Sequence, residues 1–200
     1  MHSALIQFQE NLKRAKELGS LASAVEAVTT SVIDVSDMWR SQIVLVVSAL
    51  DHFVHDITRL GMIEIAKGSR QKTDAYLRFQ MPFTAVESAL NGVPHENWVG
   101  ETVREKLSWQ SFQDPDKLAE AVRLISVVKL WEAVGIELNM PAADVKTRLK
   151  LIVERRNKIA HEADLDPANP GFRWPINAGM ATDTINFIEN VGKAVFKVAI

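Results

Sequence analysis

The chain has 200 residues and a formal net charge of −2; 47% of its residues are hydrophobic and 24% are charged. This composition suits a folded core and excludes a disordered chain, which would need lower hydrophobicity and a larger charge excess. Because the sequence has no cysteine, disulfides, thiolate metal sites and cysteine nucleophiles are excluded. The overall charge does not indicate nucleic-acid binding, so such binding would need a local basic patch. We expect a single domain over residues 1–200.

The N-terminal segment is expected to be helical. From about Ser3 to Thr29, apolar residues recur at three- and four-residue spacing, which predicts one long helix or a helical hairpin loosened at Gly19. No basic region precedes an apolar run here, so we do not expect a signal peptide. The most apolar stretch, residues 43–50, is too short to span a bilayer. We therefore expect a cytoplasmic protein with no membrane partner.

A second helix is expected to begin at Ser36 or Asp37, both good N-cap residues, and to run to about Lys67, where Gly68 and Ser69 end it. Apolar residues occur around most of its circumference, which predicts burial on most sides and a central place in the fold. The expected core positions are Ile43, Val44, Val46, Val47, Leu50, Phe53, Val54, Ile57 and Leu60.

The rest of the chain predicts further helices and no strands, which makes the expected fold all-α. In residues 71–113, Pro82, Gly92, Pro94 and Gly100 are expected to separate short helices. Asp114 is expected to cap a helix that Pro115 opens and that reaches Trp131. Pro141 is expected to open a helix over about 142–162. An irregular stretch over 164–177 and a last helix over about 180–198 follow.

The helix expected at residues 142–162 carries an arginine that requires an explanation. Arg156 is in phase with an apolar stripe, and a buried arginine is costly unless it is paired or faces a polar cavity or partner. The stripe consists of Val145, Leu149, Ile152 and Ile159. Asn157 and His161 are four residues apart and share a face. Arg156 lies roughly 140° around the helix from His161, a geometry that suits a site shared by two subunits across a two-fold axis.

The same helix concentrates positive charge, which attracts phosphate groups. Between residues 145 and 161 the only acidic residue is Glu154, and the basic residues are Lys146, Arg148, Lys150, Arg155, Arg156 and Lys158. A structural explanation also exists, because basic helix faces are commonly just solvated. In addition, an arginine and a histidine near a helix C-terminus interact favourably with the helix dipole.

Residues 154–162 resemble the motif of the HEPN superfamily, in which four to six residues separate an arginine from a histidine and a polar residue often follows the arginine directly. Residues 48–56 resemble the second helix of the RiboL-PSP type of this superfamily, and residues 164–176 resemble the loop that follows the histidine. Residues 71–113 match no pattern that we recognise. The resemblance implies a HEPN-type helical bundle with long central helices, frequent dimerisation and, in many members, endoribonuclease activity without a metal. Other members are non-catalytic modules for dimerisation or RNA binding.

This resemblance implies that Arg156, Asn157 and His161 are catalytic residues that need no metal or other cofactor. Arginine can hold a phosphate through two hydrogen bonds, and histidine can transfer protons near neutral pH. The expected product has a 2′,3′-cyclic phosphate. The expected partners are RNA, a second copy of the chain, and a possible antitoxin or other protein of a defence system. Family members whose antitoxin is a nucleotidyltransferase often have a tyrosine where this chain has Ala163, so we do not expect that kind of modification.

Three further residues are candidates for supporting roles. Asp51 and His55, four residues apart on the second helix, can line the site, with Asp51 pairing with Arg156; alternatively, the two satisfy each other in the core. Lys158 is a candidate substrate contact.

His52 and Asp56 have a spacing that metal ligands use, but the further ligands of a metal phosphohydrolase are missing from the sequence. The five tryptophans are scattered, and only Trp174 is expected to reach substrate.

Overall fold

The structure is a computed structural model that describes residues 1–29 and 32–200. Its helices are α1 (His2–Val28), α2 (Ser36–Ala66), α3 (Asp74–Leu77), α4 (Phe83–Leu90), α5 (His95–Leu107), α6 (Pro115–Arg123), α7 (Leu130–Leu138), α8 (Ala142–His161) and α9 (Ala178–Ala199). The described ranges contain no strand, and one isolated antiparallel bridge joins Leu165 to Arg173. The predicted all-α class is therefore confirmed. No helix in these ranges is both long and apolar enough to cross a membrane.

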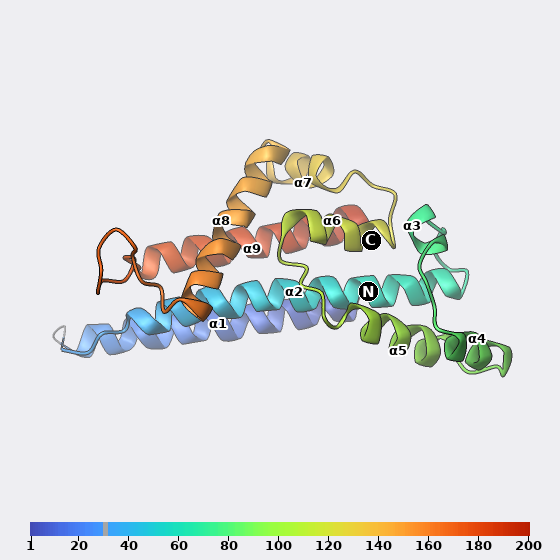
Figure 1. The fold of residues 1–200 in the computed structure, drawn as a ribbon. Helices are drawn as coiled ribbons and strands as arrows, with labels where there is room; N and C mark the ends of the chain where they lie inside the picture. Colours follow the sequence, from blue (N-terminus) through green and yellow to red (C-terminus); the bar gives the residue numbers. More distant parts are fainter. Residues whose placement is uncertain (30–31) are drawn as a thin grey trace.

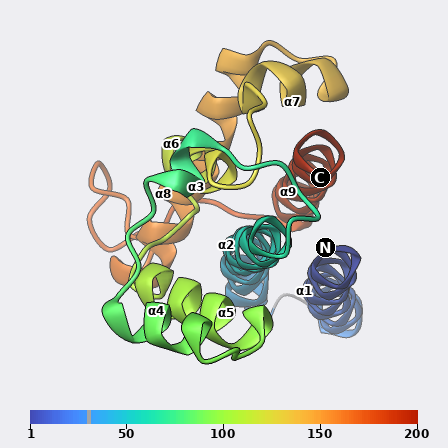
Figure 2. The same cartoon turned by 90° about the vertical axis from the view of Figure 1, so that its right-hand side faces the viewer.

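Helix α2 is the axis around which the other helices are arranged (Figure 1). The antiparallel α1 packs along it, and α9 packs against both, so that Figure 2 shows these three long helices nearly end-on. Helices α5, α6 and α8 contact the other side of α2, where the C-terminal half of α8 crosses it. The prediction that the second helix is central is confirmed.

The core is built on apolar side chains of α2. The Phe8 ring of α1 stacks on Phe53 of α2 with a centroid distance of 4.9 Å, and both rings are 1% exposed. Burial of each such side chain contributes about 1.5–3 kcal/mol to folding. The predicted α2 core positions are buried except for Val44 and Leu60, which are half-buried.

Of the two alternatives for the N-terminal segment, one long helix is confirmed and a hairpin at Gly19 is wrong; the expected N-cap of α2 is also wrong. Helix α1 is continuous through Gly19, because this glycine lets α1 approach Gln42 of α2, whose amide donates to the Ala15 carbonyl oxygen at 2.7 Å. The N-cap of α2 is Val35 instead of Ser36 or Asp37. The Ser36 hydroxyl is not free to cap, since it accepts a hydrogen bond from Arg40 Nη1 at 2.6 Å.

The helix predicted to continue to Trp131 is interrupted after Arg123. The Trp131 indole donates to the Pro115 carbonyl oxygen at 3.0 Å, so the chain must turn back toward the start of α6, which a straight helix cannot do. Asp114 and Pro115 do open α6 as predicted. Gly100 does not separate helices, because it lies inside α5 and packs against the side chain of Ile63.

Gly192 tests the packing of α9 on α1. A Cβ at this position would lie 2.6 Å from Phe8 Cζ, which is too close for any real contact. We expect Gly192→Ala to lower the free energy of unfolding by about 1–2 kcal/mol, because overpacking outweighs the better helix propensity of alanine. Urea denaturation measures this. The cost should shrink in a Phe8→Leu background, and an equal cost in both backgrounds would contradict the explanation.

Candidate functional site

The C-terminal end of α8 turns sharply into the loop of residues 162–177. Ala163 and Asp164 both have positive φ, at 52° and 59°, and the Asp164 N–H donates to the Lys158 carbonyl oxygen at 3.0 Å. This left-handed conformation costs a non-glycine residue about 1–2 kcal/mol. The turn therefore needs stabilising contacts from elsewhere in the fold.

A buried carboxylate supplies these contacts. Asp164 is 0% exposed, and its Oδ2 accepts hydrogen bonds from Arg40 Nε at 2.7 Å and from Arg155 Nη2 at 2.8 Å. Both arginines also donate to the Trp174 carbonyl oxygen. Burial lowers the pKa of the Arg155 guanidinium, and the negative charge of Asp164 opposes that shift. This Arg40–Asp164–Arg155 cluster ties the start of α2 to the end of α8 and to the loop.

Because Arg155 points into the cluster, Arg156 is turned by about 100° around the helix and points elsewhere. Its Nη2 donates to Gln113 Oε1, in the segment between α5 and α6, and Gln113 is only 7% exposed. The Nε atom of Arg156 is buried and has no hydrogen-bond partner within residues 1–29 and 32–200. Arg156 is half-buried, so the costly arginine identified in the sequence is compensated by a neutral amide.

Asp51 and His55 hold the segment that carries Gln113. Asp51 Oδ1 accepts a hydrogen bond from the Phe112 N–H at 2.6 Å, and His55 Nε2 donates to the Gln110 carbonyl oxygen at 3.2 Å. The His55 ring also packs on the Phe112 ring, with a centroid distance of 4.5 Å. Neither expected pairing forms: within the described ranges, Asp51 is hydrogen-bonded neither to Arg156 nor to His55. Its influence on Arg156 is indirect, through residues 110–113.

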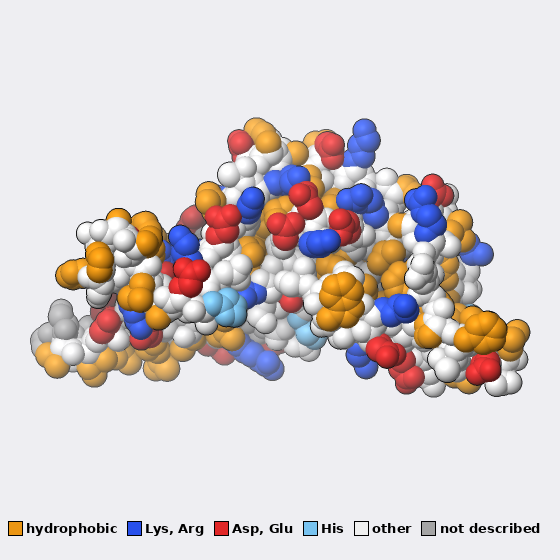
Figure 3. Space-filling view, in the orientation of Figure 1, with side chains coloured by type: hydrophobic (Ala, Val, Ile, Leu, Met, Phe, Trp, Pro, Cys, Tyr) orange, Lys and Arg blue, Asp and Glu red, His pale blue; other side chains and the backbone are white. Residues whose placement is uncertain are grey.

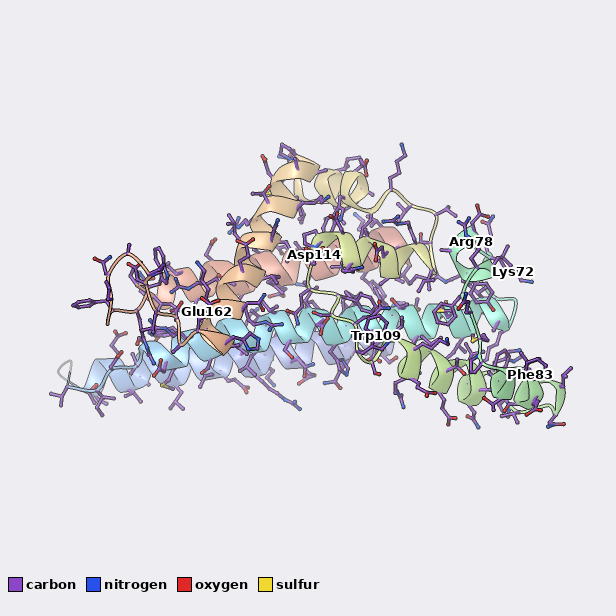
Figure 4. The ribbon with its side chains drawn as sticks, viewed as in Figure 1. Lys72, Arg78, Phe83, Trp109, Asp114 and Glu162 are labelled. Carbon is purple, nitrogen blue, oxygen red and sulfur yellow. The ribbon has the colours of Figure 1, made fainter. Side chains whose placement is uncertain are left out.

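Asn157 and His161 lie on the exposed surface of α8. In the described part of the chain their side chains form no hydrogen bond, and none joins His161 to Arg156. His161 immediately precedes Glu162, which Figure 4 shows where the end of α8 lies in front of α2. Lys158 Nζ lies 5.4 Å from the centroid of the Trp174 ring, a cation–π distance. The catalytic assignment of Arg156, Asn157 and His161 stays a prediction.

The positive charge of α8 is partly neutralised by other elements. Lys146 is 2.7 Å from Asp116, Arg148 is 2.6 Å from Asp183, and Arg155 contacts Asp164. Figure 3 accordingly shows acidic and basic side chains interspersed over this region instead of one continuous basic patch. Among the described residues, the basic residues of this helix without a carboxylate partner are Lys150, Arg156 and Lys158. Uncompensated charge is therefore found mainly near the end of α8.

Sequence inspection missed Arg40, Asp164 and Gln113. The sequence pattern places Asp164 at the start of an irregular stretch, although an acidic residue shortly after a helix with adjacent arginines is a weak signal of an ion pair. Gln113 carries no charge or pattern that could mark it. No group of three or more His, Asp or Glu residues in the described ranges has an arrangement suited to a metal.

The RiboL-PSP-HEPN family model matches residues 9–199 of the chain. The match includes residues 71–113, for which inspection of the sequence found no resemblance. Comparisons with curated proteins and with solved structures give no match.

Asp164→Asn tests the charge of the buried cluster. Asparagine tolerates positive φ and keeps the shape of the side chain, so the variant removes charge alone. We expect the free energy of unfolding to fall by about 2–4 kcal/mol, because Arg155 loses its carboxylate partner and Arg40 keeps only the exposed Asp37, 3.6 Å away. Chemical denaturation measures the change. Asp183→Asn, which removes an exposed ion pair, should cost at most about 1 kcal/mol; equal effects of the two variants would show that burial of the cluster adds nothing.

Proposed function

Because the chain belongs to the RiboL-PSP-HEPN family, we propose that it is a metal-independent endoribonuclease with Arg156, Asn157 and His161 as its catalytic residues. The observation that carries this proposal is the arrangement at the end of α8. Asn157 and His161 are exposed there and form no hydrogen bond with their side chains to the residues that the structure describes, beside an Arg156 that Gln113 anchors. The His161 imidazole and the Asn157 amide, which form no hydrogen bond to the described residues, are therefore available to bind a substrate.

The proposed reaction is attack of an RNA 2′-hydroxyl on the adjacent phosphorus. The bond from phosphorus to O2′ forms and the bond to O5′ breaks, which leaves a 2′,3′-cyclic phosphate and a 5′-hydroxyl. His161 accepts the proton from O2′, and the partner subunit's His161 donates a proton to O5′. No redox step or metal is required for this proton transfer.

Arg156 is proposed to stabilise the negative charge that develops on the phosphorane. A guanidinium has five N–H donors in a planar fork, and Gln113 occupies one of them, so other donors can bind phosphate oxygens. Anchoring by a neutral amide leaves the full positive charge of Arg156 for the phosphate. Asn157 is proposed to orient His161 or a phosphate oxygen, and Lys158 to add charge at the substrate.

We further propose that a homodimer completes the site, since Arg156 and His161 point to different sides of one helix. A second subunit that packs on α8 would also cover Leu151, whose apolar side chain is 59% exposed. Residues 1–200 would then act as one HEPN-like domain in the cytoplasm. A defence effector or toxin, with a possible antitoxin or other defence-system protein as partner, is the biological role that we propose.

A non-catalytic HEPN module for RNA binding or dimerisation is the second candidate. The half-buried position of Arg156 and its hydrogen bond to Gln113 favour it, because they give this arginine a structural role that does not depend on catalysis. Cleavage and binding assays on the same proteins distinguish the two candidates.

His161→Ala tests the proposed activity. We expect it to reduce cleavage of a single-stranded RNA by about 10²- to 10⁴-fold, the usual contribution of a general acid or base. Cleavage is measured by gel electrophoresis with chelator present, and mass spectrometry identifies the 2′,3′-cyclic end. His95→Ala, at the start of α5, is the matched histidine control and should cleave normally.

Undiminished cleavage by the His161→Ala protein would exclude His161 from catalysis. If neither the wild-type protein nor the variant cleaves RNA but both bind it, the non-catalytic module is supported instead. Light scattering should find both proteins dimeric. A dimeric variant that does not cleave RNA has lost catalysis and not dimerisation.

A further inference from the structure

A cleft of about 290 Å³ between α2 and α5 lies outside the α8 site. Most of its lining surface is apolar, and its base is formed by the buried side chains of Val103 and Leu107. The polar side chains that line it are His52, His55, Asp56, Arg59, Arg104 and Ser108. Ligand pockets commonly measure roughly 300–1,000 Å³, so the volume of this cleft suits a small group such as one nucleotide.

The cleft carries a net positive charge in a chain whose total is negative. Arg59 and Arg104 supply two positive charges, and Asp56 supplies one negative charge. Asp56 lies 3.5 Å from both His52 Nδ1 and Arg59 Nη2, so neither contact is a tight ion pair. Arg104 is exposed and has no carboxylate partner in the described ranges. Guanidinium groups in a concave site favour phosphate as the ligand.

An exposed aromatic side chain borders the adjoining cavity, which shares Leu107 with this cleft. Trp109 follows Ser108 of the cleft wall and is 79% exposed, whereas the other four tryptophans are buried or half-buried. Figure 4 shows Trp109 and Glu162 on the same face of the molecule, both in front of α2. An indole face left to solvent is a platform on which an unpaired base can stack.

The cleft and the α8 site are connected by a short segment. His55, in the cleft wall, donates to the Gln110 carbonyl oxygen, and Gln113, three residues later, accepts from Arg156. A polynucleotide that passes over Trp109 therefore has a cationic group on either side of residues 110–113. Only a single strand offers an unpaired base to Trp109 while its backbone lies against these groups.

We propose that this cleft and Trp109 form a subsite for single-stranded RNA, in which Trp109 stacks on a base and Arg59 and Arg104 bind the adjacent phosphate. The subsite deepens the proposed ribonuclease function and rests on it, since it names the strand state of the substrate. It also assigns a role to part of residues 71–113, the segment in which inspection of the sequence found no resemblance.

RNA binding by the full chain tests the subsite separately from cleavage. The His161→Ala protein is mixed with a fluorescein-labelled single-stranded RNA of mixed sequence, and anisotropy gives the Kd at several salt concentrations. Adding Trp109→Ala should weaken binding by about tenfold, as expected for loss of one stacked base, whereas Trp109→Phe should keep most of the affinity. Adding Arg104→Ala should lower the slope of log Kd against log salt by roughly 0.7, the value for one phosphate contact on a single strand.

Two matched controls lie away from the cleft. Phe83→Ala removes an aromatic ring that is 81% exposed on α4, and Lys72→Ala removes an exposed cation. Figure 4 shows both residues at the end of the molecule opposite Glu162. Both variants should bind RNA as tightly as the parent protein, and circular dichroism should show that all variants are folded.

The possible outcomes separate the subsite from the enzymatic proposal. If Trp109→Ala and Arg104→Ala bind like the controls, or if duplex RNA binds as tightly as the single strand, the subsite is refuted even when the wild-type protein cleaves RNA. If these two variants lose affinity while the wild-type protein cleaves nothing, the subsite stands and the catalytic proposal fails.

Discussion

The buried carboxylate of Asp164, held between the guanidinium groups of Arg40 and Arg155, is the contact on which the geometry of the α8 site depends. It joins residues 124 positions apart in the chain and stabilises two consecutive residues with positive φ. Burying one negative charge between two positive ones is favourable only when hydrogen bonds satisfy the groups. The Trp174 carbonyl oxygen supplies part of that satisfaction. The end of α8 is therefore fixed in direction as well as in position.

The fixed direction of α8 gives its two adjacent arginines different contacts. Arg155 is committed to the cluster, and the helical turn of about 100° per residue sends Arg156 away from it. Arg156 then meets an amide that has no charge of its own. A carboxylate at that place would neutralise Arg156, whereas Gln113 holds the guanidinium and leaves its charge available. The same logic applies to α8 as a whole, where carboxylates of α6 and α9 pair with Lys146 and Arg148 in the first half of the helix.

The functional proposals all depend on α2 as a common support. Asp51 and His55 fix residues 110–113 from one side, and His52, Asp56 and Arg59 of the same helix line the cleft. A rigid, buried helix can keep the distance and orientation between two sites constant, which a flexible loop cannot do. The match of one family model to residues 9–199 agrees with a fold in which these parts belong together.

The sequence by itself determined the helical class, the central place of the second helix, the start of α6 at Asp114 and the motif on α8, because periodicity, capping and motif spacing are local properties of the chain. Only the tertiary structure decided which partner each charged group has. Arg40, Gln113 and Asp164 contact residues far away in sequence, so no local pattern marks them. For the same reason the break before Trp131 and the exposure of Trp109 were not predictable: both depend on what the rest of the fold packs against those residues.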